Sequence, residues 1–259
     1  MTTTLFDNRK SVIHRLNPVT KLIALLAIIV IVFAIPLWWV AGLIVVLVVL
    51  PAAVLSGAGG ALLSISLKIL LPILAALFIV QGLTYPGGET VIWQWGIISV
   101  SSEGLVFALG IGSRIIVLVL TSILLVLTTH PGELMSALTE RGMSPKFAYI
   151  ISSTLQLIPA FKDRADSILL AQQARGLSLK GSPIHRMKVL LPLLSPLILG
   201  MFTDVEERST AMEARAFGST AKRTALIPVP DTMAQRIARW FFVVLALAAV
   251  ATPIALGLL

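Results

Sequence analysis

Residues 171–176 read Ala-Gln-Gln-Ala-Arg-Gly, and residues 211–216 read Ala-Met-Glu-Ala-Arg-Ala. Both stretches follow the pattern Ala-x-x-Ala-Arg and then a small residue, and their arginines, Arg175 and Arg215, are 40 positions apart. One copy alone is an ordinary helix ending, because arginine favours the negative end of the helix dipole and Gly176 suits a left-handed cap. Two copies in matched surroundings raise a second possibility, that both are docking points for a soluble partner protein.

The residues around the two patterns are matched as well. A carboxylate stands nine residues before each arginine. Alanines keep a helix end thin enough for a groove to close around it, and a guanidinium offers a planar fork to carboxylates or carbonyls. Ala216 stands where the first copy has glycine, so Gly218 offers an alternative cap for the second helix. The candidate docking residues are Ala174, Arg175, Gly176, Ala214, Arg215 and Ala216, with Asp166, Glu206, Glu213 and Gly218 in support.

Composition indicates an integral membrane protein. Of the 259 residues, 57% are hydrophobic and 12% are charged, whereas a soluble domain is nearer half apolar and a quarter charged. The chain has no cysteine, which excludes disulfides, zinc-cysteine sites and thiol nucleophiles. The net charge of +8 fits retention of Lys and Arg on the cytoplasmic side of a membrane. No aromatic-basic RNA motif is present, so we expect a lipid bilayer as partner and no nucleic acid.

Apolar runs predict about five transmembrane helices, the first beginning after the turn at Asn17-Pro18. A single long helix kinked at Pro36 is an alternative to separate first and second spans. Fourteen of the 20 Lys and Arg lie between Arg141 and Arg239, which predicts a cytoplasmic N-terminus and a cytoplasmic segment before the last span. The expected spans are Val19–Ile35, Leu37–Leu55, Leu62–Leu83, Gly104–Leu127 and Trp240–Leu259.

The fourth span holds two notable features. Gly104, Ala108 and Gly112 recur every four residues, and small residues on one helix face let a neighbouring helix approach closely. Arg114 is the only clear charge deep in a span. An intramembrane charge is costly, so Arg114 is either a functional residue or a structural one paired with a neighbour, and both possibilities stay open.

Two long amphipathic helices are expected between the fourth and last spans. One runs from Lys146 to Arg175 with a possible kink at Pro159, and the other begins near Val189 and ends near Ala216. Lys162 and Asp166 are placed for an i,i+4 ion pair on the first. The fold class is therefore an all-α integral membrane protein with added cytoplasmic or interfacial helices. Its expected segments are an arm at 1–18, four spans at 19–128, the helix region at 129–238 and a last span at 239–259.

Two other functions, a secondary transporter and a lipid-modifying membrane enzyme, are alternatives. A secondary transporter needs ionisable groups near the middle of the membrane, and no expected span holds an Asp or Glu. A lipid-modifying membrane enzyme needs a reactive centre, but His14, His130 and His185 show no metal-ligand spacing. Ser152-Ser153 has no nearby base. We therefore expect no catalytic residue and no metal site in this chain.

Several motifs resemble the T component, the transmembrane coupling subunit of energy-coupling factor importers of vitamins and metals. Residues 14–21, His-Arg-Leu-Asn-Pro-Val-Thr-Lys, are similar to the Leu-Asp-Pro-Arg-Thr-Lys opening of that family. Residues 140–146, Glu-Arg-Gly-Met-Ser-Pro-Lys, lead to Leu-Ile-Pro at 157–159 as in the family. The paired Ala-Arg-Gly-type motifs are the most specific mark, and the resemblance covers nearly the whole chain.

The resemblance implies a role and a set of partners. A T component sits in the cell membrane beside a small substrate-capturing membrane protein, the S component. It binds two ABC-type ATPase subunits through two cytoplasmic coupling helices, whose motif arginines, here Arg175 and Arg215, dock in grooves of the ATPases. The chain has no G-x-x-x-x-G-K-[ST] loop, so ATP and Mg²⁺ belong to the partners and this chain binds no cofactor. Biotin, other vitamins, cobalt and nickel all remain open as substrates.

Overall fold

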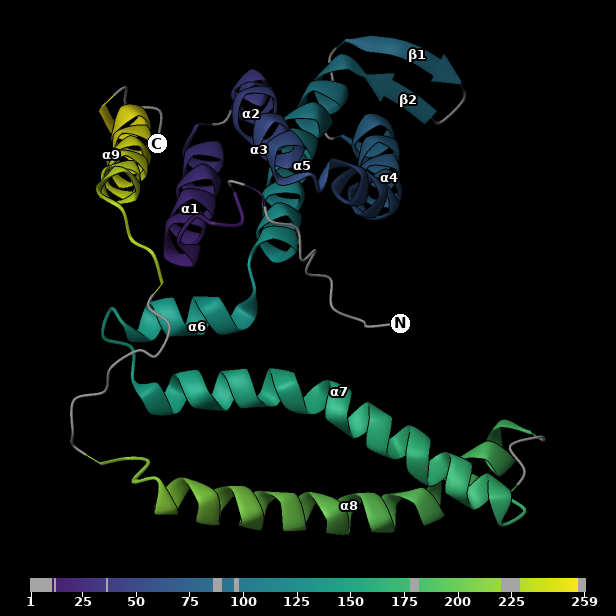
Figure 1. Ribbon diagram of the computed structural model, residues 1–259. Helices are drawn as coiled ribbons and strands as arrows, with labels where there is room; N and C mark the ends of the chain where they lie inside the picture. Colours follow the sequence, from purple (N-terminus) through teal and green to yellow (C-terminus); the bar gives the residue numbers. More distant parts are fainter. Residues whose placement is uncertain are drawn as a thin grey trace. The chain divides into compact units, whose positions relative to one another are not determined.

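The computed structural model describes residues 11, 13–35, 37–85, 90–95, 98–177, 182–219 and 229–255. Most of the N-terminal arm expected at 1–18, residues 220–228 of the expected helix region and residues 256–259 lie outside this description. Helices form nearly all of the described chain (Figure 1), which confirms the all-α membrane class. The chain divides into two compact units, one of residues 1–137 with 227–259 and the other of residues 138–226.

The first unit contains the apolar helices. Helix α1 begins after Asn17, whose side-chain oxygen accepts a hydrogen bond from the backbone N–H of Val19 at 3.0 Å, with Pro18 at the first helical position. The second span has a π-helical turn, η1, between two α-helical pieces. The elements are α1 (Pro18–Ala34), α2 (Trp38–Ile44), η1 (Val45–Val49), α3 (Leu50–Ser56), α4 (Gly59–Thr84), α5 (Ser102–Thr128), α6 (Pro131–Thr139), which ends just past the unit boundary, and α9 (Met233–Ala255).

Four helical segments in the described chain are long and apolar enough to cross a membrane, and α1 is a shorter apolar helix. Helices α1 and α2 are separate, because Ile35 and Leu37 have extended backbone angles on either side of residue 36. The alternative of one helix kinked at this proline is therefore wrong. Helix α9 begins seven residues before the expected start at Trp240. The four segments are Trp38–Ser56, Gly59–Leu83, Ser102–Thr128 and Met233–Pro253.

The buried core of this unit is a narrow apolar seam, and large apolar side chains cover much of its outside. Val49 and Val117 are each 1% exposed within the seam, whereas Leu47 and Val54 are 63% and 75% exposed. In water such a surface would be an aggregation hazard, whereas lipid chains solvate it without cost. The inverted distribution supports the membrane assignment independently of hydropathy.

Small residues let α4 and α5 pack closely, as the sequence predicts. Gly104, Ala108 and Gly112 are all buried on α5. A Cβ built at Gly104 would lie 2.3 Å from the backbone oxygen of Gln81 on α4. Between these helices the chain forms a short antiparallel hairpin of β1 (Val91–Trp95) and β2 (Ile98–Ser101), where the sequence predicts only a loop.

The second unit is a pair of long antiparallel helices, α7 (Pro145–Ala174) and α8 (Pro183–Ala214) (Figure 1). Helix α7 is continuous through Pro159, which confirms the expected single helix. Helix α8 begins six residues before the expected start near Val189 and continues through both of its internal prolines, Pro192 and Pro196.

Candidate functional site

The two motifs end the two long helices, and their side chains face outward. Every motif residue from Ala174 to Gly176 and from Ala214 to Ala216 is exposed. Neither guanidinium, of Arg175 or of Arg215, has a hydrogen-bond or ion-pair partner among the residues that the structure describes. A partner protein would therefore gain their charge-assisted hydrogen bonds without first breaking any that they make to the described residues.

The two helix ends have the same hydrogen bonds. In the first, Leu177 N–H donates to the carbonyl of Gln172 at 3.0 Å, and Gly176 N–H donates to that of Gln173 at 2.9 Å. In the second, Phe217 N–H donates to Met212 and Ala216 N–H to Glu213, both at 2.9 Å. This pair of bonds is the Schellman motif, which places each arginine at the C-cap and fixes its direction relative to the helix.

Ala216 occupies the left-handed position that Gly176 occupies in the first motif. Its φ is 53°, and it is the only non-glycine residue with positive φ in the described part of the chain. Gly218 also has positive φ, at 93°, but the two capping bonds close around Ala216. The alternative of Gly218 as the cap is therefore wrong. The left-handed conformation costs an L-residue about 1–2 kcal/mol, so the cap at the end of α8 forms despite an unfavourable backbone energy at Ala216.

A salt bridge joins the two helices at matched positions. Arg164 donates from both terminal nitrogens to the carboxylate of Asp204, at 2.6 and 3.2 Å. Gly200 makes room for the guanidinium, because a Cβ there would lie 3.1 Å from Arg164 Nη1. Arg164 and Asp204 are 40 positions apart, the same spacing as Arg175 and Arg215, and each lies eleven residues before its motif arginine.

The helix ends that carry Arg175 and Arg215, here named the tips, consequently lie at opposite ends of the helix pair. They are at equal distances along the helices from the salt bridge. Eleven residues of helix measure about 16 Å at 1.5 Å per residue. An aromatic contact fixes the second tip at the start of α7, where the ring centroids of Tyr149 and Phe217 are 5.1 Å apart. The arrangement presents two similar arginine-bearing ends in opposite directions.

The remaining predicted site residues take varied places. Asp166, Glu206 and Glu213 are exposed, and neither Asp166 nor Lys162 has a side-chain partner among the described residues, so their expected ion pair is not formed. The described part of the chain contains no cluster of three or more His, Asp or Glu residues able to hold a metal. Arg114 is partly buried on α5, and its guanidinium carbon lies 5.9 Å from the ring centre of Phe33 on α1, a cation–π contact.

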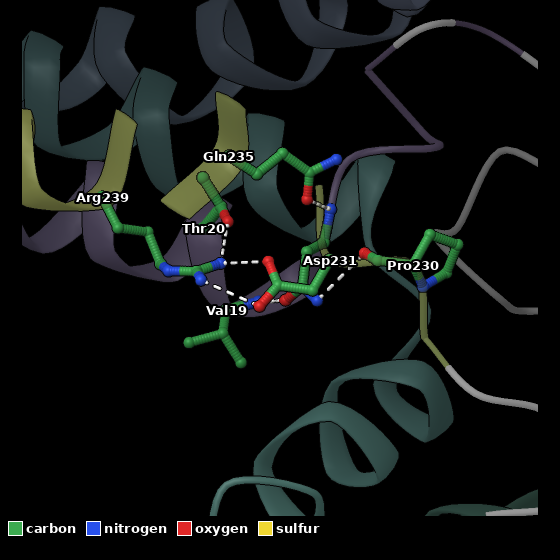
Figure 2. A network of polar contacts seen from close by, with 7 residues as sticks. Val19, Thr20, Pro230, Asp231, Gln235 and Arg239 are labelled. Atoms are coloured by element: carbon green, nitrogen blue, oxygen red, sulfur yellow. Dashed lines mark hydrogen bonds and ion pairs between the residues drawn. The ribbon is translucent and has the colours of Figure 1, made fainter. Parts of the chain in front are cut away.

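A polar cluster at the start of α1 was missed by sequence reasoning (Figure 2). Arg239 on α9 donates to both carboxylate oxygens of Asp231, at 2.8 and 2.9 Å, and to the hydroxyl of Thr20 at 2.9 Å. The side-chain oxygen of Gln235 accepts from the backbone N–H of Asn17 at 3.1 Å. The signal in the sequence is the placement of polar residues in the first turn of an apolar helix. This signal predicts a helix start and does not identify the residues to which these polar groups bond.

The sequence is similar to proteins of one known transport family. The sequence matches the family described as CbiQ, cobalt transport protein, over residues 9–226. It is 34% identical over 230 residues to the energy-coupling factor transporter transmembrane protein EcfT of Limosilactobacillus fermentum, with 83% of each chain covered. It is 33% identical over 228 residues to EcfT of Acidaminococcus fermentans, again with 83% of each chain covered.

A third relative, EcfT of Brevibacillus brevis, is 38% identical over 149 residues, which cover 54% of this chain and 56% of the relative. The family match extends over both units of the fold and includes both arginine-bearing helix ends. The chain therefore belongs to the family of T components, the transmembrane subunits of energy-coupling factor transporters.

Proposed function

We propose that this chain couples ATP hydrolysis by two ABC-type ATPase subunits to a small substrate-capturing membrane protein, for the uptake of a vitamin or a transition-metal ion. Helices α7 and α8 are the coupling helices, and the tips at Arg175 and Arg215 each enter a groove on one ATPase. ATP-driven movement of the ATPases displaces the tips, which belong to the unit of residues 138–226, here named the coupling unit. The unit of residues 1–137 with 227–259, here named the membrane unit, passes this displacement to the capture protein. Selectivity for the substrate resides in the capture protein.

One observation carries the proposal. Two exposed arginines, neither with a side-chain partner in the described part of the chain, stand at helix ends with the same capping bonds and at equal distances from the bridge that joins the helices. A pair of like tips suits a partner that offers two like grooves. The guanidinium of each tip supplies a planar, permanently charged fork for a carboxylate or for carbonyl groups of the groove.

The proposal also assigns orientation and chemistry. The N-terminus and the helix region at 129–238 face the cytoplasm, supported by the fourteen Lys and Arg between Arg141 and Arg239. The chain is not an enzyme, and ATP with Mg²⁺ binds to the partner subunits, supported by the lack of a G-x-x-x-x-G-K-[ST] loop in the sequence.

Charge reversal at the tips tests the proposal. The chain carrying both Arg175→Glu and Arg215→Glu is co-expressed with the ATPase pair and the capture protein, and ATPase recovery and substrate uptake are measured. Because each reversal replaces attraction with repulsion in a desolvated contact, we expect recovery to fall by about ten-fold or more. Insertion in the membrane should be unchanged, since both positions are exposed.

Arg208→Glu is the matched control. Arg208 is also exposed on α8, two turns before Arg215, so it has the same charge change on the same helix away from the tip. We expect Arg208→Glu to retain ATPase recovery and Arg215→Glu to lose most of it. Equal recovery for Arg208→Glu and Arg215→Glu, or normal uptake by the double variant, would contradict docking through the tips.

A further inference from the structure

The chain crosses between its two units twice, and one turn of helix bonds to residues that precede the first crossing and follow the second. The first crossing lies near the end of α6, the short helix that follows α5, and the second lies shortly before α9. The turn in question is the start of α1, residues 17–21, here named the α1 collar. Its polar side chains make bonds to other elements of the membrane unit, beyond those needed to begin a helix.

On the outgoing side, Lys21 holds the end of α5, nine residues before the unit boundary. Its ammonium donates to the backbone carbonyl of Thr128, the last residue of α5, at 2.7 Å. Thr128 is 3% exposed, and α6 begins only three residues later at Pro131. A cation at a helix C-terminus interacts favourably with the unpaired carbonyls and the helix dipole. The structure thus places the Lys21 ammonium on the end of α5.

The returning crossing is held by Asn17 and Thr20. The side-chain amide of Asn17 donates to the carbonyl of Pro230 at 3.2 Å, among the first described residues of the returning chain. The hydroxyl of Thr20 accepts a hydrogen bond from Arg239, which also donates from both terminal nitrogens to the carboxylate of Asp231 (Figure 2). Asn17 and Thr20 are 2% and 6% exposed, so these bonds are shielded from competing water.

We infer that the α1 collar is the joint through which the coupling unit acts on the membrane helices, with Asn17, Thr20 and Lys21 as its positioning residues. The inference rests on the proposed coupling function. A displaced coupling unit moves the spans only if the connecting segments are fixed where they enter the membrane unit. Without a fixed point, the connections take up the displacement by local rearrangement. The collar fixes both connections to α1, which packs along α9 in the same unit (Figure 1).

The test separates coupling from assembly. The complex of the chain with its ATPase pair and capture protein is reconstituted in vesicles with Thr20→Val or Asp231→Asn, and substrate uptake per ATP hydrolysed is measured. At nearly constant volume, Thr20→Val removes the hydroxyl that accepts from Arg239, and Asp231→Asn removes the negative charge and replaces one accepting oxygen by an amide nitrogen. The expected result is a fall in uptake per ATP of about five-fold or more, the lower range of typical coupling between sites, with the ATPase rate and complex recovery retained.

Thr121→Val is the matched control. Thr121 is also 6% exposed in the membrane unit, but its hydroxyl bonds only within α5, to the carbonyls of Val117 and Leu118. Uptake per ATP should be unchanged in this variant. Asp231→Glu keeps the carboxylate, and it should recover most of the coupling that Asp231→Asn loses.

Three outcomes overturn the inference. The first is unchanged uptake per ATP in both Thr20→Val and Asp231→Asn. The second is a parallel loss of uptake, ATPase activity and complex recovery, which means that the residues serve only folding. The third is that the unmodified chain does not bind the ATPases through Arg175 and Arg215. This outcome also refutes the proposed function, and it is recognised when the charge reversals Arg175→Glu and Arg215→Glu leave ATPase recovery unchanged.

Discussion

Replacing Ala216, at the end of α8, by glycine and Gly176, at the end of α7, by alanine should have opposite effects on stability. Replacing Ala216 by glycine removes a left-handed penalty of about 1–2 kcal/mol and adds unfolded-state entropy worth about 0.4–1 kcal/mol. The Ala216→Gly tip should therefore be more stable by about 0.5–1 kcal/mol. This estimate uses the φ of 53°, which lies within the small left-handed region open to alanine.

The reverse change should cost more than the first one gains. Gly176 has a φ of 93°, beyond the left-handed region of alanine, so Gly176→Ala requires a backbone rotation as well as the left-handed penalty. A Cβ at Gly176 would meet nothing within 4 Å, so the cost is confined to the backbone. We expect the first tip to lose about 1–2 kcal/mol.

Amide hydrogen exchange of the capping bonds measures both effects. The reporters are the N–H groups of Leu177 and Phe217, which close the first and second tips. For Ala216→Gly, Phe217 should exchange about two- to five-fold more slowly, and for Gly176→Ala, Leu177 should exchange about five- to thirty-fold faster. The unaltered tip of each variant is its internal control. Unchanged or faster exchange of Phe217 in Ala216→Gly would refute the assignment of Ala216 as a strained cap.

Two further predictions concern helix packing. Gly104→Ala should lower the stability of the membrane unit by about 1–3 kcal/mol, because its Cβ would lie 2.3 Å from the Gln81 backbone oxygen, and thermal unfolding in detergent measures the loss. Gly110→Ala on the same helix, where a Cβ meets nothing within 4 Å, should not be destabilised, and an equal loss in both contradicts the packing argument. A double-mutant cycle of Arg164→Ala and Asp204→Ala should give a coupling energy of about 0.5–1 kcal/mol, since both side chains remain about a third exposed, at 38% and 33%. A coupling energy of zero in chemical denaturation would show that the bridge does not hold the helices.

The helices of this protein could be predicted from the sequence because their signals are local. The apolar runs fix the spans, and Asn17 before Pro18 marks the start of α1 through its own cap. The apolar pattern does not mark a helix start where apolar residues are sparse. For this reason α8 and α9 begin before the starts that the apolar runs predict. The outward position of Arg175 and Arg215 also followed from local pattern, since both end a helix immediately after an exposed alanine.

The bonds between helices could not be predicted in the same way. The sequence predicts a local pair of Lys162 and Asp166 on α7. The ion pair that the structure shows on this helix is instead that of Arg164 with Asp204, 40 residues away. Thr20 and Arg239 are 219 residues apart, and no periodicity connects them. A pattern of 3.6 residues assigns a side chain to a face, whereas the choice of partner on another helix depends on the packing of the whole unit.

The bridge between α7 and α8 has a consequence for symmetry. In an antiparallel pair, contact between equivalent positions of two similar segments places a local dyad at that contact, here at Arg164 and Asp204. The dyad relates one tip to the other, so a twofold-symmetric body that holds both would apply equal and opposite moments about the bridge. Helices α7 and α8 would then rotate in opposite senses about the salt bridge rather than move together by translation. Gly200 leaves the space that the Arg164 guanidinium occupies at this axis.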